Sequence, residues 1–237
     1  MARTLPERAT CEPSNGRLQE LAATLIPPPS LDELLLLRKV SPYTMVGVPR
    51  LRTLYRLAKR TIAQRIPGAF VECGTCNGGS GAVLAHVAAT EHRAVWLFDS
   101  FEGLPEPAPE DGDSALGWKG GCLGQQAMVS EVLERVDARV EEVHIVKGWF
   151  EDTLVAASTG AIAVLHLDGD WYESTRQILN ALYDRIDPHG YLAVDDYGHW
   201  PGCKRAVDEF FKERGLQPKI VRSDYTGVWF VKPSPAA

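Results

Sequence analysis

Four aspartates in two short segments could do chemistry together. Asp168 and Asp170 belong to LHLDGDWYEST, and Asp195 and Asp196 belong to LAVDDYGHW. If these carboxylates converge, they cannot all stay ionised without a compensating positive charge. A hard cation that prefers oxygen ligands, such as Mg²⁺, Mn²⁺ or Ca²⁺, would supply that charge. The residue types therefore indicate a candidate metal site.

Each pair of aspartates lies at the end of an apolar run that is typical of a buried strand, at 161–168 and 190–196. Neighbouring parallel strands end side by side, about 5 Å apart, so the carboxylates should meet at one rim of a sheet. A helix cap or a solvated acidic loop is the competing interpretation. His166, inside the first run, is interpreted as a packing residue. His199, in the loop after the second run, is predicted to contact substrate.

The rest of the chain predicts the sheet that would carry these strands. Further strands are expected at 69–73, 94–99 and 142–147, and helices at 79–88, 125–136, 150–157, 174–186 and 203–214. Alternating strands and helices indicate a parallel sheet covered on both faces. The tail PKIVRSDYTGVWFVK predicts two last strands around a Tyr-Thr-Gly turn. The prediction is an α/β fold with seven strands, mostly parallel, and one antiparallel edge strand.

The region before this sheet predicts a different organisation. Residues 1–17 are expected to form a mobile arm and 18–66 an N-terminal helical lid, with 67–237 as the catalytic domain. Helices are expected at 31–40, after Ser30 as N-cap, and at 50–66. The apolar stretch DELLLL could form the interface of a homodimer or higher homo-oligomer, or it could pack on the main domain.

A glycine-rich segment, FVECGTCNGGSG, follows the first expected strand and runs into a helix. Glycines such as Gly74 let the backbone approach a ligand closely, and Ser80 and the amides at the helix start can bind a carboxylate or phosphate. A merely tight connection is the alternative. The segment contains neither G-x-x-x-x-G-K-[ST] nor G-x-G-x-x-G, which argues against a nucleoside triphosphatase and a dinucleotide dehydrogenase.

Two further strand ends complete the expected cofactor pocket. Asp99 ends the second strand, where an acidic side chain can accept both hydroxyls of a ribose. That position fits NAD and S-adenosylmethionine equally well. Gly148 follows the third strand, and Trp149 or Phe150 could cover an adenine ring, although core packing explains Phe150 as well.

Bulk properties narrow the function classes. The net charge of −6, with 24% charged residues, argues against a nucleic-acid surface. The sequence has neither an apolar run long enough for a membrane span nor a secretory h-region, so no membrane partner and a cytoplasmic location are expected. Cys73 and Cys76 form a C-x-x-C, but without a second pair a zinc site is disfavoured, and a redox dithiol is a minor alternative.

The motifs together resemble the macrocin O-methyltransferase family, whose members tailor antibiotic sugars and aminocoumarins. The resemblance runs from about Tyr43 to Lys232, through PYTMVGVPRL, VECGTCNGGSG, DSFEGLP, KGWFEDTL, LDGDWYEST, GYLAVDDYG and CKRAVDEFF. It implies a class I methyltransferase Rossmann-like fold and Mg²⁺ held by Asp168, Asp195 and Asp196 beside S-adenosylmethionine. It also implies Asp170 as general base. The residues implied to line the cofactor site are Tyr43, Thr44, Met45, Glu72, Gly74, Thr75, Ser80, Asp99, Ser100, Phe101, Gly148, Trp149, Phe150 and Asp168.

The hypothesis is therefore an S-adenosylmethionine- and Mg²⁺-dependent O-methyltransferase that acts on a small-molecule hydroxyl, in a sugar of a natural product or a nucleotide sugar. A catechol-like phenol is the first alternative acceptor, because it presents a similar oxygen pair to a metal. An NAD(P)-dependent oxidoreductase and a non-catalytic binding protein are weaker alternatives. The stretch 106–124 is predicted to be a variable substrate-side loop or a disordered surface loop.

Overall fold

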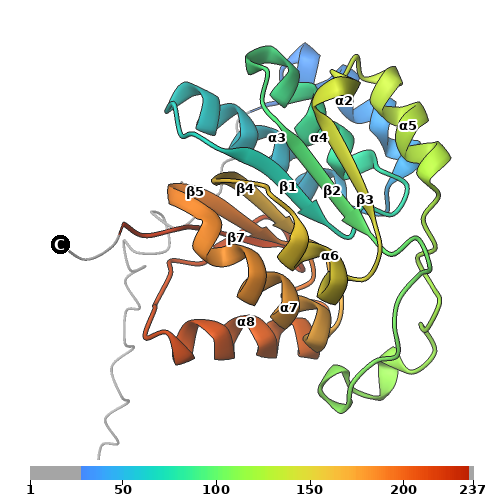
Figure 1. The fold of residues 1–237 in the computed structure, drawn as a ribbon, viewed down its shortest axis with the longest axis vertical. Coiled ribbons are helices and arrows are strands. Elements are labelled where there is room, and N and C mark those ends of the chain that lie inside the picture. Colours follow the sequence, from blue (N-terminus) through green and yellow to red (C-terminus); the bar gives the residue numbers. More distant parts are fainter. Residues whose placement is uncertain (1–27, 235–237) are drawn as a thin grey trace, which may run out of the picture.

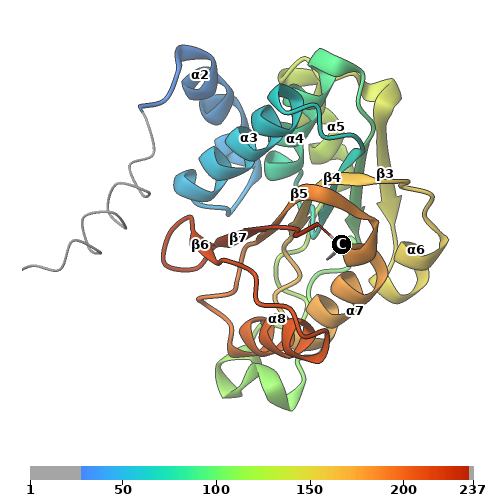
Figure 2. The ribbon, with the colours of Figure 1, turned by 90° about the vertical axis from the view of Figure 1, so that its left-hand side faces the viewer.

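A computed structural model describes residues 28–234 as a seven-stranded sheet between two layers of helices (Figures 1 and 2). The strand order is β3-β2-β1-β4-β5-β7-β6. The strands are β1 (Ala69–Cys73), β2 (Val95–Asp99), β3 (Val143–Lys147), β4 (Ile162–Leu167), β5 (Ile186–Val194), β6 (Val221–Arg222) and β7 (Val228–Val231). Strands β1 to β5 pair in parallel, which confirms the predicted α/β fold.

The reversed strand predicted from the tail is β7, which pairs antiparallel with β5. It lies one position in from the edge, because the two-residue strand β6 pairs antiparallel with β7 and occupies the edge itself. The turn between them is capped by Asp224, whose Oδ1 accepts hydrogen bonds from the backbone of Thr226 and Gly227 at 2.9 and 2.8 Å.

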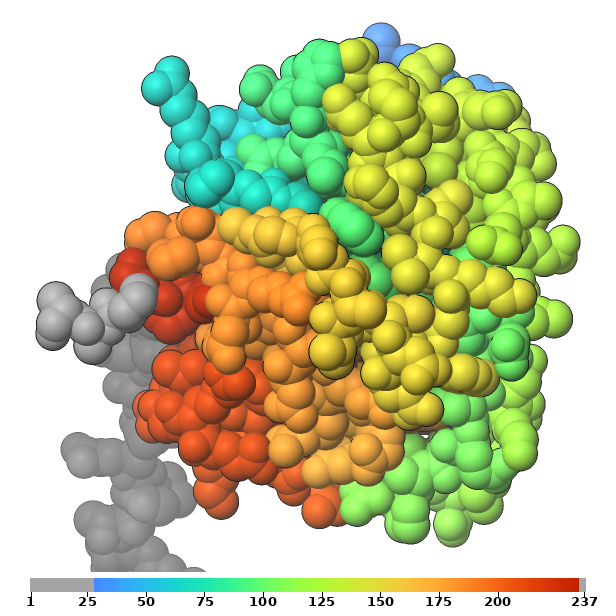
Figure 3. All heavy atoms as spheres, viewed as in Figure 1, coloured from blue at the N-terminus to red at the C-terminus, as the bar shows by residue number. Residues whose placement is uncertain are grey.

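Seven α-helices of the described residues cover the two faces of the sheet. They are α2 (Leu31–Val40), α3 (Val48–Ala63), α4 (Gly79–Ala88), α5 (Gln126–Arg135), α6 (Phe150–Ala156), α7 (Tyr172–Leu182) and α8 (Pro201–Glu213). One hydrophobic core lies under α2, α3, α4 and α5, and a second lies under α6, α7 and α8. Figure 3 shows the side chains of α6, α7 and α8 closing the second face. The sheet is therefore covered on both faces, as the strand pattern predicts.

One helix ends earlier than predicted. The sequence predicts a helix over 174–186, but α7 ends at Leu182 and a 3₁₀ turn covers Tyr183–Arg185. Strand β5 then begins at Ile186, which pairs with Ile162 of β4. Sheet pairing at a distance thus overrides the local helical pattern.

The N-terminal helices pack against the main domain. Ser30 caps α2 as predicted, its Oγ accepting a hydrogen bond from the backbone of Glu33 at 3.1 Å. Leu36 and Leu37 are buried in the first core, while other leucines of α2 are exposed. The predicted mobile arm at 1–17, and the lid up to residue 27, lie outside the described residues. Within 28–234 no helix has the length and apolar character needed to cross a membrane.

Candidate active site

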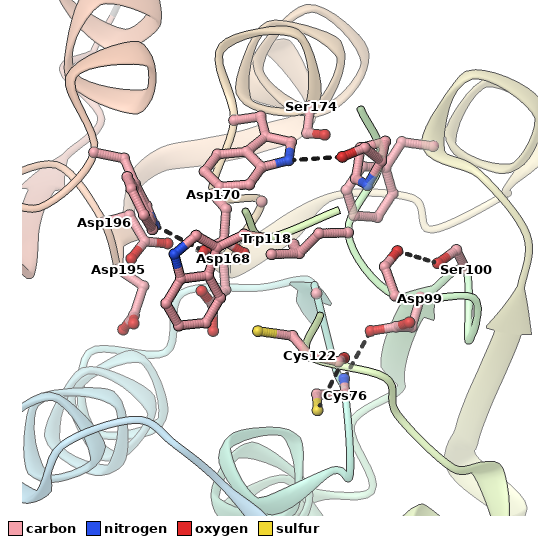
Figure 4. A pocket seen from close by; sticks show the side chains of 18 of the residues that line it. Cys76, Asp99, Ser100, Trp118, Cys122, Asp168, Asp170, Ser174, Asp195 and Asp196 are labelled. Carbon is pink, nitrogen blue, oxygen red and sulfur yellow. Dashed lines mark hydrogen bonds between the residues drawn. The ribbon is translucent and has the colours of Figure 1, made fainter. Parts of the chain in front are cut away.

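A pocket of about 890 Å³ lies at the C-terminal ends of the parallel strands (Figure 4). Its walls come from the segment before α3, from the loops that follow β1 to β5, and from the segment between β2 and α5. Ligands of open α/β sheets bind at this edge, where the strand order reverses between β1 and β4. The structure thus has a pocket at the strand ends, where the sequence predicts the site.

The strand register brings the four aspartates into this pocket. Leu167 pairs with Val194, and the backbone N–H of Asp195 donates to the carbonyl oxygen of Leu167 at 2.9 Å. Carboxylate oxygens of Asp168, Asp170 and Asp196 lie within 4.8 Å of one another. A second group with the same spacing joins Asp168 and Asp195 to His166. Asp168 is common to both groups.

This crowding changes the protonation of the carboxyl groups. Burial, followed by repulsion from Asp195 and Asp196, raises the pKa of Asp168 well above its ordinary value. Burial and the charge of Asp170 raise the pKa of Asp196 in the same direction. The Oδ2 atom of Asp196 is buried and has no hydrogen-bond partner in the protein. These oxygens form an acidic cluster whose mutual repulsion the nearby guanidinium of Arg50 offsets only in part.

Asp195, in contrast, has protein partners for both oxygens. Its Oδ2 forms an ion pair with the guanidinium of Arg50, at the start of α3. Its Oδ1 lies 3.5 Å from Nε2 of His166. Arg50 has a second carboxylate partner, Asp224, at 3.1 Å. The sequence interpretation missed both Arg50 and Asp224, because only the folded chain brings them to this rim.

His166 is buried, as its interpretation as a packing residue predicts, but it also forms a polar link. Its Nδ1 lies 2.9 Å from Oε1 of the fully buried Glu72 on β1. Burial lowers the pKa of His166, but hydrogen bonds to Asp195 and Glu72 outweigh burial and raise the pKa to about 9. A protonated His166 therefore forms an ion pair with Asp195.

Asp170 is held in a strained backbone conformation with its side chain fixed. Its φ of 54° lies in the left-handed region, which a non-glycine residue rarely adopts and which recurs at functional sites. The indole Nε1 of Trp200 donates to Oδ1 of Asp170 at 3.0 Å. Burial raises the pKa of Asp170 to about 6, against this hydrogen bond from Trp200 and with added repulsion from Asp195.

At the end of the pocket away from the four aspartates lies the carboxylate of Asp99, and backbone atoms around Gly74 also line the pocket. Gly74 has a φ of 96°, and a Cβ at this position would lie 1.7 Å from the carbonyl oxygen of Asp168. Asp99 accepts backbone hydrogen bonds from Cys76 and Phe101, both at 2.7 Å. Burial raises the pKa of Asp99 even though these hydrogen bonds oppose the shift. This arrangement fixes a carboxylate where a ribose was predicted to bind.

Most of the predicted cofactor residues line the pocket. These are Thr44, Met45, Gly74, Thr75, Ser80, Asp99, Ser100, Gly148, Trp149, Phe150 and Asp168. Three others lie outside its lining: Glu72 is buried against His166, Phe101 packs in the first core, and Tyr43 hydrogen-bonds to Glu131 and Arg135. Their roles toward a cofactor stay predictions.

His199 and the segment 106–124 also border the pocket. His199 is exposed and packs edge-on against Trp200, with ring centroids 4.6 Å apart. Residues of the segment, including Trp118 and Cys122, line the pocket. The segment is an ordered part of the structure, with two short 3₁₀ turns at Pro109–Asp111 and Asp113–Ala115, so the disordered-loop interpretation is wrong.

The C-x-x-C pair does not form a redox dithiol site in this arrangement. Cys73 is fully buried in β1, and both Cys73 and Cys76 are free thiols. Burial raises the pKa of each thiol, which lowers the thiolate fraction that redox chemistry needs.

Comparison with known proteins agrees with this architecture. The family model Macrocin-O-methyltransferase (TylF) matches residues 38–232. The demethyldecarbamoylnovobiocin O-methyltransferase of Streptomyces niveus is 34% identical over 198 residues, covering 79% of this chain and 75% of that protein. The 8-demethyl-8-(2,3-dimethoxy-alpha-L-rhamnosyl)-tetracenomycin-C 4'-O-methyltransferase of Streptomyces olivaceus is 36% identical over 196 residues, with the same coverages. The solved structure of the O-methyltransferase NovP superposes with a TM-score of 0.75 at 31% identity, covering 81% of this chain and 83% of that one.

The sheet order and the pocket at its carboxyl edge define a class I methyltransferase fold, and the similar proteins are O-methyltransferases. The chain belongs to the macrocin-O-methyltransferase family. It is an S-adenosylmethionine-dependent O-methyltransferase, and the NAD(P)-dependent oxidoreductase and binding-protein alternatives are wrong.

Proposed function

We propose that this enzyme uses Mg²⁺ and methylates a hydroxyl group on the sugar of a natural product or of a nucleotide sugar. The observation that carries the metal dependence is the buried, unpartnered Oδ2 of Asp196 beside Asp168 and Asp170. A cluster of carboxylate oxygens whose repulsion Arg50 offsets only in part fits Mg²⁺ better than zinc.

Asp168, Asp195 and Asp196 would hold the metal. Asp168 belongs to both groups of closely spaced ligand atoms, and Asp196 has an oxygen free for coordination. Asp195 is engaged by Arg50, but Arg50 also pairs with Asp224. Asp195 can therefore turn an oxygen toward a cation without leaving the guanidinium unpaired.

Asp170 would act as the general base. A base works best when its pKa lies near the working pH, and the pKa of Asp170 is raised to about 6. A bound Mg²⁺ would lower the pKa of a chelated hydroxyl and orient it. Asp170 would accept the hydroxyl proton while the oxygen attacks the methyl group of the sulfonium donor, and the Trp200 hydrogen bond would keep the carboxylate in position.

The acceptor class is supported by the relatives and by the pocket wall. Two of the relatives act, according to their names, on demethyldecarbamoylnovobiocin and on a rhamnosyl-tetracenomycin. Next to Asp170 the pocket is lined by aromatic side chains, among them Trp118, Trp171 and Trp200. His199, which also lines the pocket, would contact the acceptor.

A two-stage experiment tests this proposal. Calorimetric titration with S-adenosylhomocysteine first verifies that the purified enzyme binds the product of the methyl donor. Methyl transfer is then assayed with a panel of 4-nitrophenyl glycosides and with catechol, in Mg²⁺ and in EDTA, by the mass gain of one CH₂ group. We expect methylated glycosides in Mg²⁺ only.

Each part of the proposal can fail separately in this design. Methylation of catechol without any glycoside would overturn the sugar acceptor and favour the phenolic one. An undiminished rate in EDTA would overturn the metal dependence.

A further inference from the structure

The segment between β2 and α5 forms a closed loop at the mouth of the pocket. The backbone N–H groups of Leu104 and Gly120 donate to the carbonyl oxygens of Gly121 and Leu104, both at 2.9 Å. The two ends of this loop, residues 104 and 121, are therefore joined like the neck of an Ω-loop. In Figure 3 the green atoms of this region lie against α7 and α8 at the lower edge of the molecule.

Asp111 anchors the loop to the main domain. This fully buried aspartate accepts hydrogen bonds from the backbone of Tyr172 and of Ala108, both at 2.7 Å. It fits against the start of α8 because residue 202 is glycine: a Cβ there would lie 1.8 Å from Oδ1 of Asp111. Trp171 adds a hydrogen bond from its Nε1 to the carbonyl oxygen of Pro105 at 3.1 Å. A loop with these anchors can hold a side chain in a fixed place.

Among the side chains that this loop presents to the pocket is Trp118. Its ring meets that of Trp200 edge to face, with centroids 6.1 Å apart and planes at 76°. Trp171 also packs edge to face against Trp200, with centroids 4.9 Å apart and planes at 71°. Trp118 is nevertheless 47% exposed, so much of its ring lacks a protein partner. Figure 4 shows Trp118 projecting over the same part of the pocket as Asp168 and Asp170.

Trp200 contacts both Trp118 and Asp170, the proposed general base. Its indole Nε1 donates to Asp170 at 3.0 Å, and its ring packs edge to face against Trp118. A ring whose hydroxyl reaches Asp170 would lie in the corner between the two indoles. The flat ring of tryptophan suits the C–H face of a pyranose, while the rim residues Lys119 and Glu106, paired at 2.5 Å, offer a donor and an acceptor for outward hydroxyls.

We propose that Trp118 is the platform on which the pyranose ring of the acceptor stacks, and that the Leu104–Gly121 loop sets the sugar specificity of this enzyme. The inference rests on the proposed function, since it names the group that binds beside Asp170. It assigns to Trp118 a role in acceptor affinity and none in binding the methyl donor.

The test compares Trp118→Ala and Trp118→Phe with the unchanged enzyme. The probes are the 4-nitrophenyl and methyl glycosides of rhamnose, fucose, glucose and xylose. Truncation to alanine should raise the KM for the methylated glycosides by roughly 10-fold and change kcat by less than about 3-fold. Phenylalanine, which keeps a flat ring, should restore most of the affinity.

Leu116→Ala is the matched control, because Leu116 is an exposed apolar residue of the same loop that does not line the pocket. It should leave the KM unchanged, and none of the variants should alter the Kd for S-adenosylhomocysteine or the Tm. Equal KM values for Trp118→Ala and the unchanged enzyme would overturn the inference alone. An effect confined to the 4-nitrophenyl glycosides would overturn it in favour of contact with the aglycone.

Failure of the proposed function gives a different result. If S-adenosylhomocysteine binds but no glycoside of the panel is methylated by the unchanged enzyme, the sugar acceptor itself is wrong and the role of Trp118 falls with it.

Discussion

Asp99 and Asp196 lie at strand ends in the same pocket, but their oxygens have different partners. Both oxygens of Asp99 accept backbone hydrogen bonds, from Cys76 and Phe101. Asp196 has one buried oxygen without a partner and lies within 4.8 Å of Asp168 and Asp170. The end of the pocket around Asp99 is therefore complete in the protein alone, whereas the carboxylate end would be completed by the proposed cation. This difference predicts that the two ends can be disabled separately.

The largest effect is expected from Asp168→Asn, at the carboxylate end. Asp168 belongs to both groups of closely spaced ligand atoms. Its loss should lower kcat by about 10³-fold or more, because metal stabilisation of the reacting oxygen is worth several kcal/mol. Rapid quench measurements in Mg²⁺ give kcat, and calorimetry gives the Kd for S-adenosylhomocysteine, which should change by less than about 3-fold. Full activity of this variant in EDTA would refute the metal mechanism.

The reciprocal change is Asp99→Asn, at the cofactor end. An asparagine has only one carbonyl oxygen, so one of the backbone donors, Cys76 or Phe101, loses its acceptor and the predicted ribose contact is weakened. The Kd for S-adenosylhomocysteine should rise by about 10- to 100-fold, the cost of a lost hydrogen bond to a charged group. Calorimetry measures it. An unchanged Kd would show that Asp99 is not part of the cofactor site. The predicted difference between the two ends of the pocket would then be wrong.

A third effect concerns the stability of the fold, through His166, whose Nε2 lies 3.5 Å from Oδ1 of Asp195. Its pKa is about 9 in the folded chain against 6.5 for an ordinary histidine. The folded state thus binds the proton more tightly, so the stabilisation is complete below about pH 6.5 and disappears as the pH rises through 9. It should amount to about 3 kcal/mol.

Urea unfolding in EDTA across this pH range measures the contribution as the difference between the unchanged enzyme and His166→Gln. The slope of stability against pH should be shallower in the variant, because a glutamine does not titrate. Parallel slopes in the two proteins would mean that the carboxylates, and not His166, bind the proton.

The sequence predicted the sheet and the aspartate rim well, because both depend on local signals. Alternating apolar runs mark the strands, and Asp168 and Asp195 directly follow two of them. The partner of Asp195 could not be predicted in this way, since Arg50 lies 145 residues away in the chain and reaches the rim only through the packing of α3. Trp118 was missed for a similar reason: the segment 106–124 has no periodicity, and its position depends on the buried anchor Asp111.

The smallest predicted effect is a change in the stability of the Asp196→Asn variant. It distinguishes repulsion among the carboxylates from metal binding. In EDTA, Asp196→Asn should stabilise the protein by about 1 kcal/mol, or a Tm increase of roughly 2–4 °C, because it removes one of several crowded acidic groups and adds an amide that can donate to Asp168 or Asp170. In millimolar Mg²⁺ the order should reverse, since only the unchanged enzyme gains the stabilisation of a ligand bound to the folded state. Asp113→Asn, at an exposed position outside the pocket, controls for the change in net charge. A lower Tm of Asp196→Asn in EDTA would mean that the carboxylate stabilises the metal-free fold, so that the unpartnered oxygen would no longer argue for a cation.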